Sequence, residues 1–160
     1  AAVALSGAPV APAAAQTAAF EGAYKLTLVF GSACQAQIPS VSVTLTLHET
    51  TVARGSEVTG RPARSDEAPV AGLTLMRSGS TVHGPFSARG GLEDRDEITS
   101  GEGWLLIPWL MLDGTVTAGD RPQARGSAFG FLAAGGPEED YPSSLGRCTG
   151  TGFSWTLEPQ

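Results

Sequence analysis

Lysine is nearly absent from this chain of 160 residues, in which Lys25 is the single example. Lysine and arginine together number 10 against 16 aspartates and glutamates, so the formal net charge is -6. A nucleic-acid-binding face needs a local surplus of basic side chains to neutralise phosphates, and the arginines here are scattered from Arg54 to Arg147. The composition therefore argues against nucleic acid as a partner.

Catalytic motifs are also scarce. His48 and His83 are the only histidines, and each falls in a strand pattern where a surface or turn-proximal histidine is ordinary. No serine lies in a G-x-S-x-G turn, and no glycine-rich loop follows a strand to open a helix, so neither acyl transfer nor phosphate binding has a supporting motif. We therefore expect a protein that is not an enzyme and has no cofactor.

Two acidic clusters, Glu93–Glu97 and Glu138–Asp140, are the candidates for a metal site. Carboxylate oxygens suit a hard cation, but neither cluster has the Asp-x-Asp-x-Asp-Gly order of a calcium loop. The alternative is a solvated loop, and the second cluster, flanked by Pro137 and Pro142, also suits a contact surface. We expect no bound metal.

Cysteine is rare as well, with Cys34 and Cys148 the only two. Residues 1–19 are rich in alanine and proline and carry no charge, which is typical of the end of a secretory signal peptide, with Ala13-Ala14-Ala15 as an A-x-A-like cleavage site. Export favours a disulfide between the two cysteines, and two buried free thiols are the alternative. We expect an exported protein, periplasmic or extracellular, in which 20–160 form one β-barrel domain and 1–19 are a signal-peptide remnant or a docking arm.

Helical periodicity is missing too, apart from the proline-interrupted tail, and the hydrophobic residues instead alternate with a period of two. In 41–47 the odd positions are valine or leucine and the even ones serine or threonine, which is typical of a half-buried strand. We expect strands at about 24–30, 41–47, 52–60, 70–77, 80–88, 104–112, 115–132 and 150–158, with a turn at Asp113-Gly114. The sequence therefore predicts an all-β fold, an antiparallel up-and-down barrel of about eight strands.

The two ends of the chain predict how this sheet closes. Cys34 follows the first strand and Cys148 precedes the last, as expected for two antiparallel neighbours. Pairing Leu28 with Phe153 and Leu26 with Trp155 would place the large side chains of both strands on one face, as would pairing Tyr24 with Leu157. A first strand beside the last closes the barrel and removes its edges.

Residues 20–158 resemble the lipocalin-like (calycin) barrels, especially small secreted bacterial ones. The resemblance rests on Gly22-Ala23-Tyr24 at the start and on the aromatic last strand with Phe153-Ser154-Trp155. Lipocalins have tryptophan where this chain has Tyr24, and the last strand here carries no arginine to pack across it. The resemblance implies a barrel that binds a small apolar molecule in its interior, and it implies no catalytic residues.

The longest apolar run, Trp104–Leu112, has more hydrophobic residues than one face of a strand needs. If Leu105, Ile107, Trp109 and Met111 point inward, the outward set is Trp104, Leu106, Pro108, Leu110 and Leu112. A loop or the chain's own tail could cover this outward stripe, or a partner protein or membrane surface could. A third possibility is that the strand leaves the barrel wall at Pro108 and forms a flap.

Two functions follow from these patterns. The first is an accessory or stabilising subunit that docks on a larger, possibly membrane-associated complex, bioenergetic or of the cell envelope, through the outward stripe. The second is a lipocalin-like carrier of a small apolar ligand. Its interior would be lined by Tyr24, Leu26, Leu28, Trp109, Phe153 and Trp155.

Overall fold

The structure is a computed structural model that describes residues 18–30, 40–62, 72–91, 104–135 and 148–160. These residues form eight antiparallel strands. They are β1 (Gly22–Val29), β2 (Ser40–Val52), β3 (Gly55–Pro62), β4 (Gly72–Ser78), β5 (Thr81–Gly91), β6 (Trp104–Thr117), β7 (Gln123–Gly135) and β8 (Cys148–Pro159). Within these ranges there is no helix of the length and apolar character that crossing a membrane requires.

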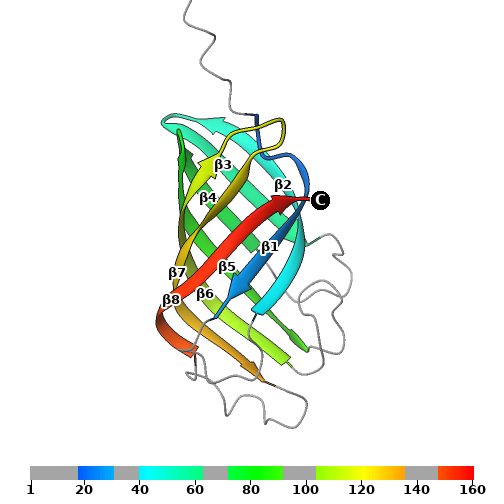
Figure 1. Ribbon diagram of the computed structural model, residues 1–160, viewed down its shortest axis with the longest axis vertical. Coiled ribbons are helices and arrows are strands. Elements are labelled where there is room, and N and C mark those ends of the chain that lie inside the picture. Colours follow the sequence, from blue (N-terminus) through cyan, green and yellow to red (C-terminus); the bar gives the residue numbers. More distant parts are fainter. Residues whose placement is uncertain (1–17, 31–39, 63–71, 92–103, 136–147) are drawn as a thin grey trace, which may run out of the picture.

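Each strand pairs with the next one in sequence, and β8 pairs with β1, so the sheet closes into a barrel (Figure 1). The prediction of an all-β barrel closed by its first and last strands is therefore confirmed. The short connections β2–β3, β4–β5 and β6–β7 lie at one end together with Ala18–Glu21, as Figure 1 shows. We call this the hairpin end.

The pairing of β1 with β8 differs from the predicted register by two residues. Leu28 lies opposite Trp155 and Leu26 opposite Leu157, whereas the sequence pattern placed Leu28 opposite Phe153. Because side chains alternate with a period of two, a shift of two residues leaves every side chain on its predicted face. The hydrophobic pattern alone could not distinguish the two registers.

Inward positions fill the barrel with side chains of complementary size. The large ones come mainly from β1 and β8, where Tyr24, Leu26 and Trp155 are at most 1% exposed. The inward positions of β7 instead hold the small residues Ala124, Gly126 and Ala128. An eight-stranded barrel has an interior about wide enough for side chains to fill, and this size pattern matches such packing.

Two paired glycines bring β6 and β7 close together, and one of them, Gly114, makes room for the Trp155 indole. Gly114 lies opposite Gly126, and a Cβ at Gly114 would stand 2.5 Å from Cζ2 of Trp155. The indole N–H donates to the backbone carbonyls of Asp113 at 3.2 Å and Ser127 at 3.0 Å. The predicted turn at Asp113-Gly114 was therefore wrong, because β6 continues to Thr117 and these residues lie within the strand.

β6 contains one extra residue, which reverses its inside and outside positions. Ala88 of β5 pairs with Ile107, and Phe86 pairs with Leu110, so Pro108 and Trp109 together lie opposite a single residue, Ser87. This is a β-bulge, a place where a proline is tolerated because its missing N–H leaves no ladder bond unmade. Beyond the bulge the alternation is shifted by one residue, which exchanges the two faces.

The bulge corrects the predicted faces of four residues and the predicted flap. Leu110 and Leu112, expected outside, lie in the core at 0% exposure, while Trp109, expected inside, is 39% exposed. Met111 is also outside the core and half-buried. The strand does not leave the wall at Pro108, since β6 pairs with β5 and β7 on both sides of it.

Candidate functional site: the outer wall of β6 and β7

The outer wall of β6 and β7 has two chemically different halves. Its outward cross-strand pairs toward the hairpin end are polar: Thr117 with Gln123, Thr115 with Arg125, and Asp113 with Ser127. Farther from that end the pairs become apolar, Met111 with Phe129 and Trp109 with Phe131. Elsewhere the outward positions are mainly serine, threonine and charged residues, as on β2 with Ser42, Thr44 and Thr46. The apolar half is therefore exceptional for this barrel.

Three exposed aromatic rings define the apolar half, and we call Trp109, Phe129 and Phe131 the aromatic cluster. Their exposures are 39%, 39% and 49%. The Trp109 ring centroid lies 6.1 Å from that of Phe129 and 5.4 Å from that of Phe131, at interplanar angles of 89° and 73°. Edge-to-face contacts of this kind stabilise aromatic pairs by about 0.5–1.5 kcal/mol beyond the area they bury. The rings therefore hold one another in place while staying accessible.

Gly130 allows Trp109 to lie against β7. Its φ is +143°, and a Cβ there would stand 3.0 Å from two atoms of the Trp109 ring and 2.6 Å from the Trp109 carbonyl oxygen. Any side chain at this position would push the indole off the strand. The aromatic cluster therefore requires a glycine between the two phenylalanines. The sequence analysis did not identify Phe129 and Phe131 as surface residues, because Ala128 and Leu132 make the other face of β7 apolar as well.

The predicted interface residues are only partly on this wall. Pro108 is exposed and Leu106 is half-buried, in agreement with the outward prediction, and Trp104 belongs to β6 although its side chain lies outside the described residues. Leu110 and Leu112 lie inside the barrel. The outward set that the structure brings together is Pro108, Trp109, Met111, Phe129 and Phe131.

The predicted ligand-lining residues lie in a filled interior. Leu26, Leu28, Phe153 and Trp155 are each at most 1% exposed and belong to one continuous hydrophobic cluster. The polar atom that Trp155 brings inside is already bonded to backbone carbonyls. In the described part of the barrel, these side chains pack against one another and present no unpaired polar group to a ligand.

The hairpin end is closed by the segment that precedes β1. Phe20 is fully buried, and its ring centroid lies 5.4 Å from that of Tyr24. Its backbone N–H donates to Glu49 Oε2 at 2.7 Å, and the same oxygen lies 3.0 Å from Nη1 of Arg77. The Arg77 guanidinium also lies 5.4 Å from the Phe20 ring centroid, a cation–π contact. We call Phe20, Glu49 and Arg77 the end plug.

The end plug was not predicted, although the sequence carries a signal for it. Glu49 continues the inward series Val43, Leu45 and Leu47, and Arg77 continues the inward series of Leu73 and Leu75. When two inward positions hold residues of opposite charge, as Glu49 and Arg77 do, a buried ion pair is indicated, because an unpaired charge inside the barrel would be costly.

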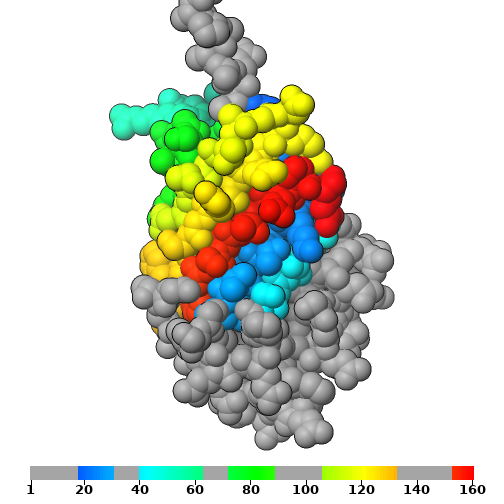
Figure 2. All heavy atoms as spheres, viewed as in Figure 1, coloured from blue at the N-terminus to red at the C-terminus, as the bar shows by residue number. Residues whose placement is uncertain are grey.

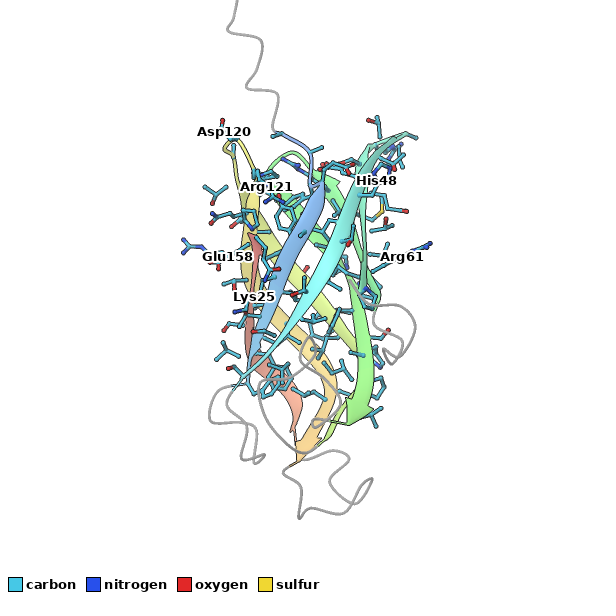
Figure 3. All side chains as sticks on the ribbon, turned by 90° about the vertical axis from the view of Figure 1, so that its right-hand side faces the viewer. Lys25, His48, Arg61, Asp120, Arg121 and Glu158 are labelled. Carbon is cyan, nitrogen blue, oxygen red and sulfur yellow. The ribbon has the colours of Figure 1, made fainter. Side chains whose placement is uncertain are left out.

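A second arginine closes the same end around Tyr24. Arg121 of the β6–β7 turn lies 4.9 Å from the Tyr24 ring centroid and donates to the carbonyls of Gln160 at 2.7 Å and Ala23 at 2.9 Å. Figure 3 shows it between that turn and the start of β1. The Tyr24 hydroxyl donates to the Pro122 carbonyl at 2.9 Å. An arginine thus packs across Tyr24, but it comes from a turn and not from the last strand.

Burial raises the pKa of the Tyr24 phenol, and the Arg121 guanidinium partly offsets this. The folded state therefore holds this proton more tightly than the unfolded chain, in which the pKa is about 10. The resulting stabilisation is complete below pH 10 and is lost as the pH rises through the raised pKa. We expect the free energy of unfolding to fall above about pH 10. Urea titrations at several pH values across this range measure the loss of stability. The Tyr24→Phe variant should not lose stability in this way. An identical alkaline loss in both proteins would show that Tyr24 is not its cause.

The remaining sequence candidates lie at the surface or outside the described residues. His48 contacts Glu21, and His83 contacts Asp113, and both histidines are exposed. The described ranges contain no group of three or more histidine, cysteine, aspartate or glutamate side chains that could hold a metal ion. Both acidic clusters, Cys34, the Cys148 side chain and residues 1–17 lie outside the description.

No protein-family model, no protein of curated function and no solved structure matches this chain. The site is therefore interpreted from its own residues.

Proposed function

We propose that this protein is a non-catalytic accessory subunit that docks on a larger assembly of the cell envelope through the outer wall of β6 and β7. The observation that supports it most is the aromatic cluster, whose rings are 39% to 49% exposed on a barrel whose other outward positions are mainly polar. Aromatic side chains are enriched in binding interfaces, where they contribute most of the binding energy from a small area. Holding three of them rigidly in water has no evident structural benefit to the barrel itself.

Removing the aromatic cluster tests this docking function. We expect wild-type protein incubated with a detergent extract of its own cell envelope to elute with a large assembly in size-exclusion chromatography. The double variant Trp109→Ser, Phe131→Ser should elute as the free protein, because each lost aromatic anchor costs about 2 kcal/mol or more of binding. The matched control is Met76→Ser, which removes a side chain of similar exposure, 45%, from β4. Elution of the wild type as a free protein would contradict the proposal.

A relationship to the lipocalin-like barrels is the finer structural proposal. Its support is the closed eight-stranded antiparallel barrel together with the arginine that packs across Tyr24. The carrier function that this relationship would imply has weaker support, since the described interior is filled by its own side chains. Mass spectrometry of the native protein distinguishes the two, because a carrier retains a small apolar ligand.

Export and a Cys34–Cys148 disulfide belong to the same proposal. The pairing of β1 with β8 supports the disulfide, because Val29, the last residue of β1, lies opposite Ser154, six residues after Cys148 in β8. Non-reducing peptide mapping checks the bond directly.

A further inference from the structure

The polar half of the outer wall carries a row of hydrogen-bonding groups centred on Arg125. Thr115 of β6 lies opposite Arg125 of β7, which in turn lies opposite Thr156 of β8. All three side chains point outward, so one guanidinium stands between two hydroxyl groups. Among the described residues, the Arg125 side chain forms no ion pair and no hydrogen bond, which leaves its donors free for a ligand.

Two adjoining hollows follow this row along the surface. One, of about 540 Å³, is lined by Asp113, Arg125 and Ser127 among others. The other, of about 280 Å³, is lined by Gln123, Arg125 and Glu158. Because Arg125 lines both, they form one shallow groove over β6, β7 and β8. Figure 2 looks onto this side, where the yellow hairpin-end parts of β6 and β7 run beside β8 in red.

The charges in the groove point to a neutral ligand. A polyanion at Arg125 would meet the carboxylates of Asp113 and Glu158, and a polycation at those carboxylates would meet Arg125. A ligand whose groups both donate and accept hydrogen bonds finds a partner at every position, since arginine only donates, carboxylates only accept, and threonine and serine do both. Hydroxyl groups of a sugar have this property.

The aromatic cluster extends the groove in the direction that a long ligand would take. Arg125, Ser127, Phe129 and Phe131 occupy successive outward positions of β7, so polar and aromatic groups share one line. At about 3.3 Å per residue this line is about 20 Å long. A chain of sugar rings offers hydroxyl groups at its rim and apolar C–H faces, which suits hydrogen bonds at one end of the line and aromatic contacts at the other.

We propose that the component of the envelope assembly bound by this wall is a neutral polysaccharide, lying along β7 with its hydroxyl groups at Arg125 and its apolar ring faces on the aromatic cluster. This inference rests on the proposed docking function and names the chemistry of the partner. Because the carboxylates of Asp113 and Glu158 line the same hollows as Arg125, an acidic glycan would be repelled where a neutral one is not.

Binding to neutral glycans tests the proposal. The probes are maltohexaose, cellohexaose and N-acetylchitohexaose, titrated calorimetrically into the full chain, with polygalacturonate as the acidic comparison. We expect saturable binding to a neutral probe, weakened about ten-fold or more in Kd by Arg125→Ala and by Trp109→Ala. Arg61→Ala on β3 and Met76→Ser on β4 are the matched controls and should bind as the wild type. Circular dichroism and thermal unfolding verify that each variant is folded.

Three results would overturn the glycan proposal: no binding to any neutral probe, tighter binding to polygalacturonate, or unchanged affinity in Arg125→Ala. The size-exclusion experiment tests the docking function separately from the glycan proposal. If the aromatic double variant loses the envelope assembly while Arg125→Ala retains it, the partner is a protein; docking then stands and the glycan proposal falls. If neither variant changes the elution, the docking function itself is wrong.

Discussion

Replacing Glu49 by alanine is expected to lower the free energy of unfolding by about 3–5 kcal/mol, because the substitution leaves the Arg77 guanidinium buried without its counter-charge. Arg77 is only 4% exposed, and it already has one nitrogen, Nη2, without a partner among the described residues. The same substitution removes the acceptor of the Phe20 N–H, so the segment before β1 loses its attachment as well. Urea denaturation monitored by tryptophan fluorescence measures the loss.

Two further variants separate the buried charge from the loss of a side chain. Glu57→Ala on the outer face of β3 is the control and should change stability by less than about 0.5 kcal/mol, as surface substitutions usually do. The double variant Glu49→Leu, Arg77→Met should recover most of the loss, because a buried ion pair replaced by apolar residues of similar size is often neutral. A double variant as unstable as Glu49→Ala would show that the ion pair itself stabilises the hairpin end.

Trp155→Ala is expected to cost about 3–5 kcal/mol, the range for truncating a large aromatic residue in a packed core. The indole is 1% exposed and lies against Gly114, which has no side chain to fill the cavity that its removal leaves. It also takes a donor away from the carbonyls of Asp113 and Ser127. Thermal or urea unfolding measures the difference.

Trp109→Ala provides the matched control, since it removes the same side chain from the outer wall. At 39% exposure, and with two edge-to-face ring contacts, to Phe129 and Phe131, it should cost less, about 1–3 kcal/mol. Equal losses for the two tryptophans would contradict the assignment of one to the core and the other to the surface.

The sequence predicted the barrel well because its evidence was local and repeated. Alternation such as that of Val41–Leu47 identifies strands, and the aromatic ends of the chain identify the strands that close the sheet. It did not predict the β1–β8 register, because registers two residues apart bury the same faces. The turn predicted at Asp113-Gly114 failed for a related reason. Asp-Gly is typical of a hairpin turn, but here the glycine lies within a strand because it leaves room for the Trp155 indole.

The candidate site was located in the right strand, but Leu110 and Leu112, two of its five residues, were placed on the wrong face. Along Trp104–Leu112 every position is apolar, so the pattern of polar and apolar residues gives no sign of where the alternation is interrupted. The proline was the available signal, since within a sheet it favours edges and bulges. The partners of Trp109 lie on the next strand, β7, and only the cross-strand register shows which of its residues they are.

The bulge at Pro108 and Trp109 makes the identity of the displayed residues depend on strand length. If the bulge lacked its extra residue, the Trp109 indole would point into the barrel, and Leu110 and Leu112 would point toward water. A point substitution in this strand changes one side chain of the outer wall, whereas a deletion or insertion turns the outward side chains into the core and the core side chains outward. In distant relatives, therefore, the spacing between Ile107 and Leu110 should diagnose this wall better than residue identity does.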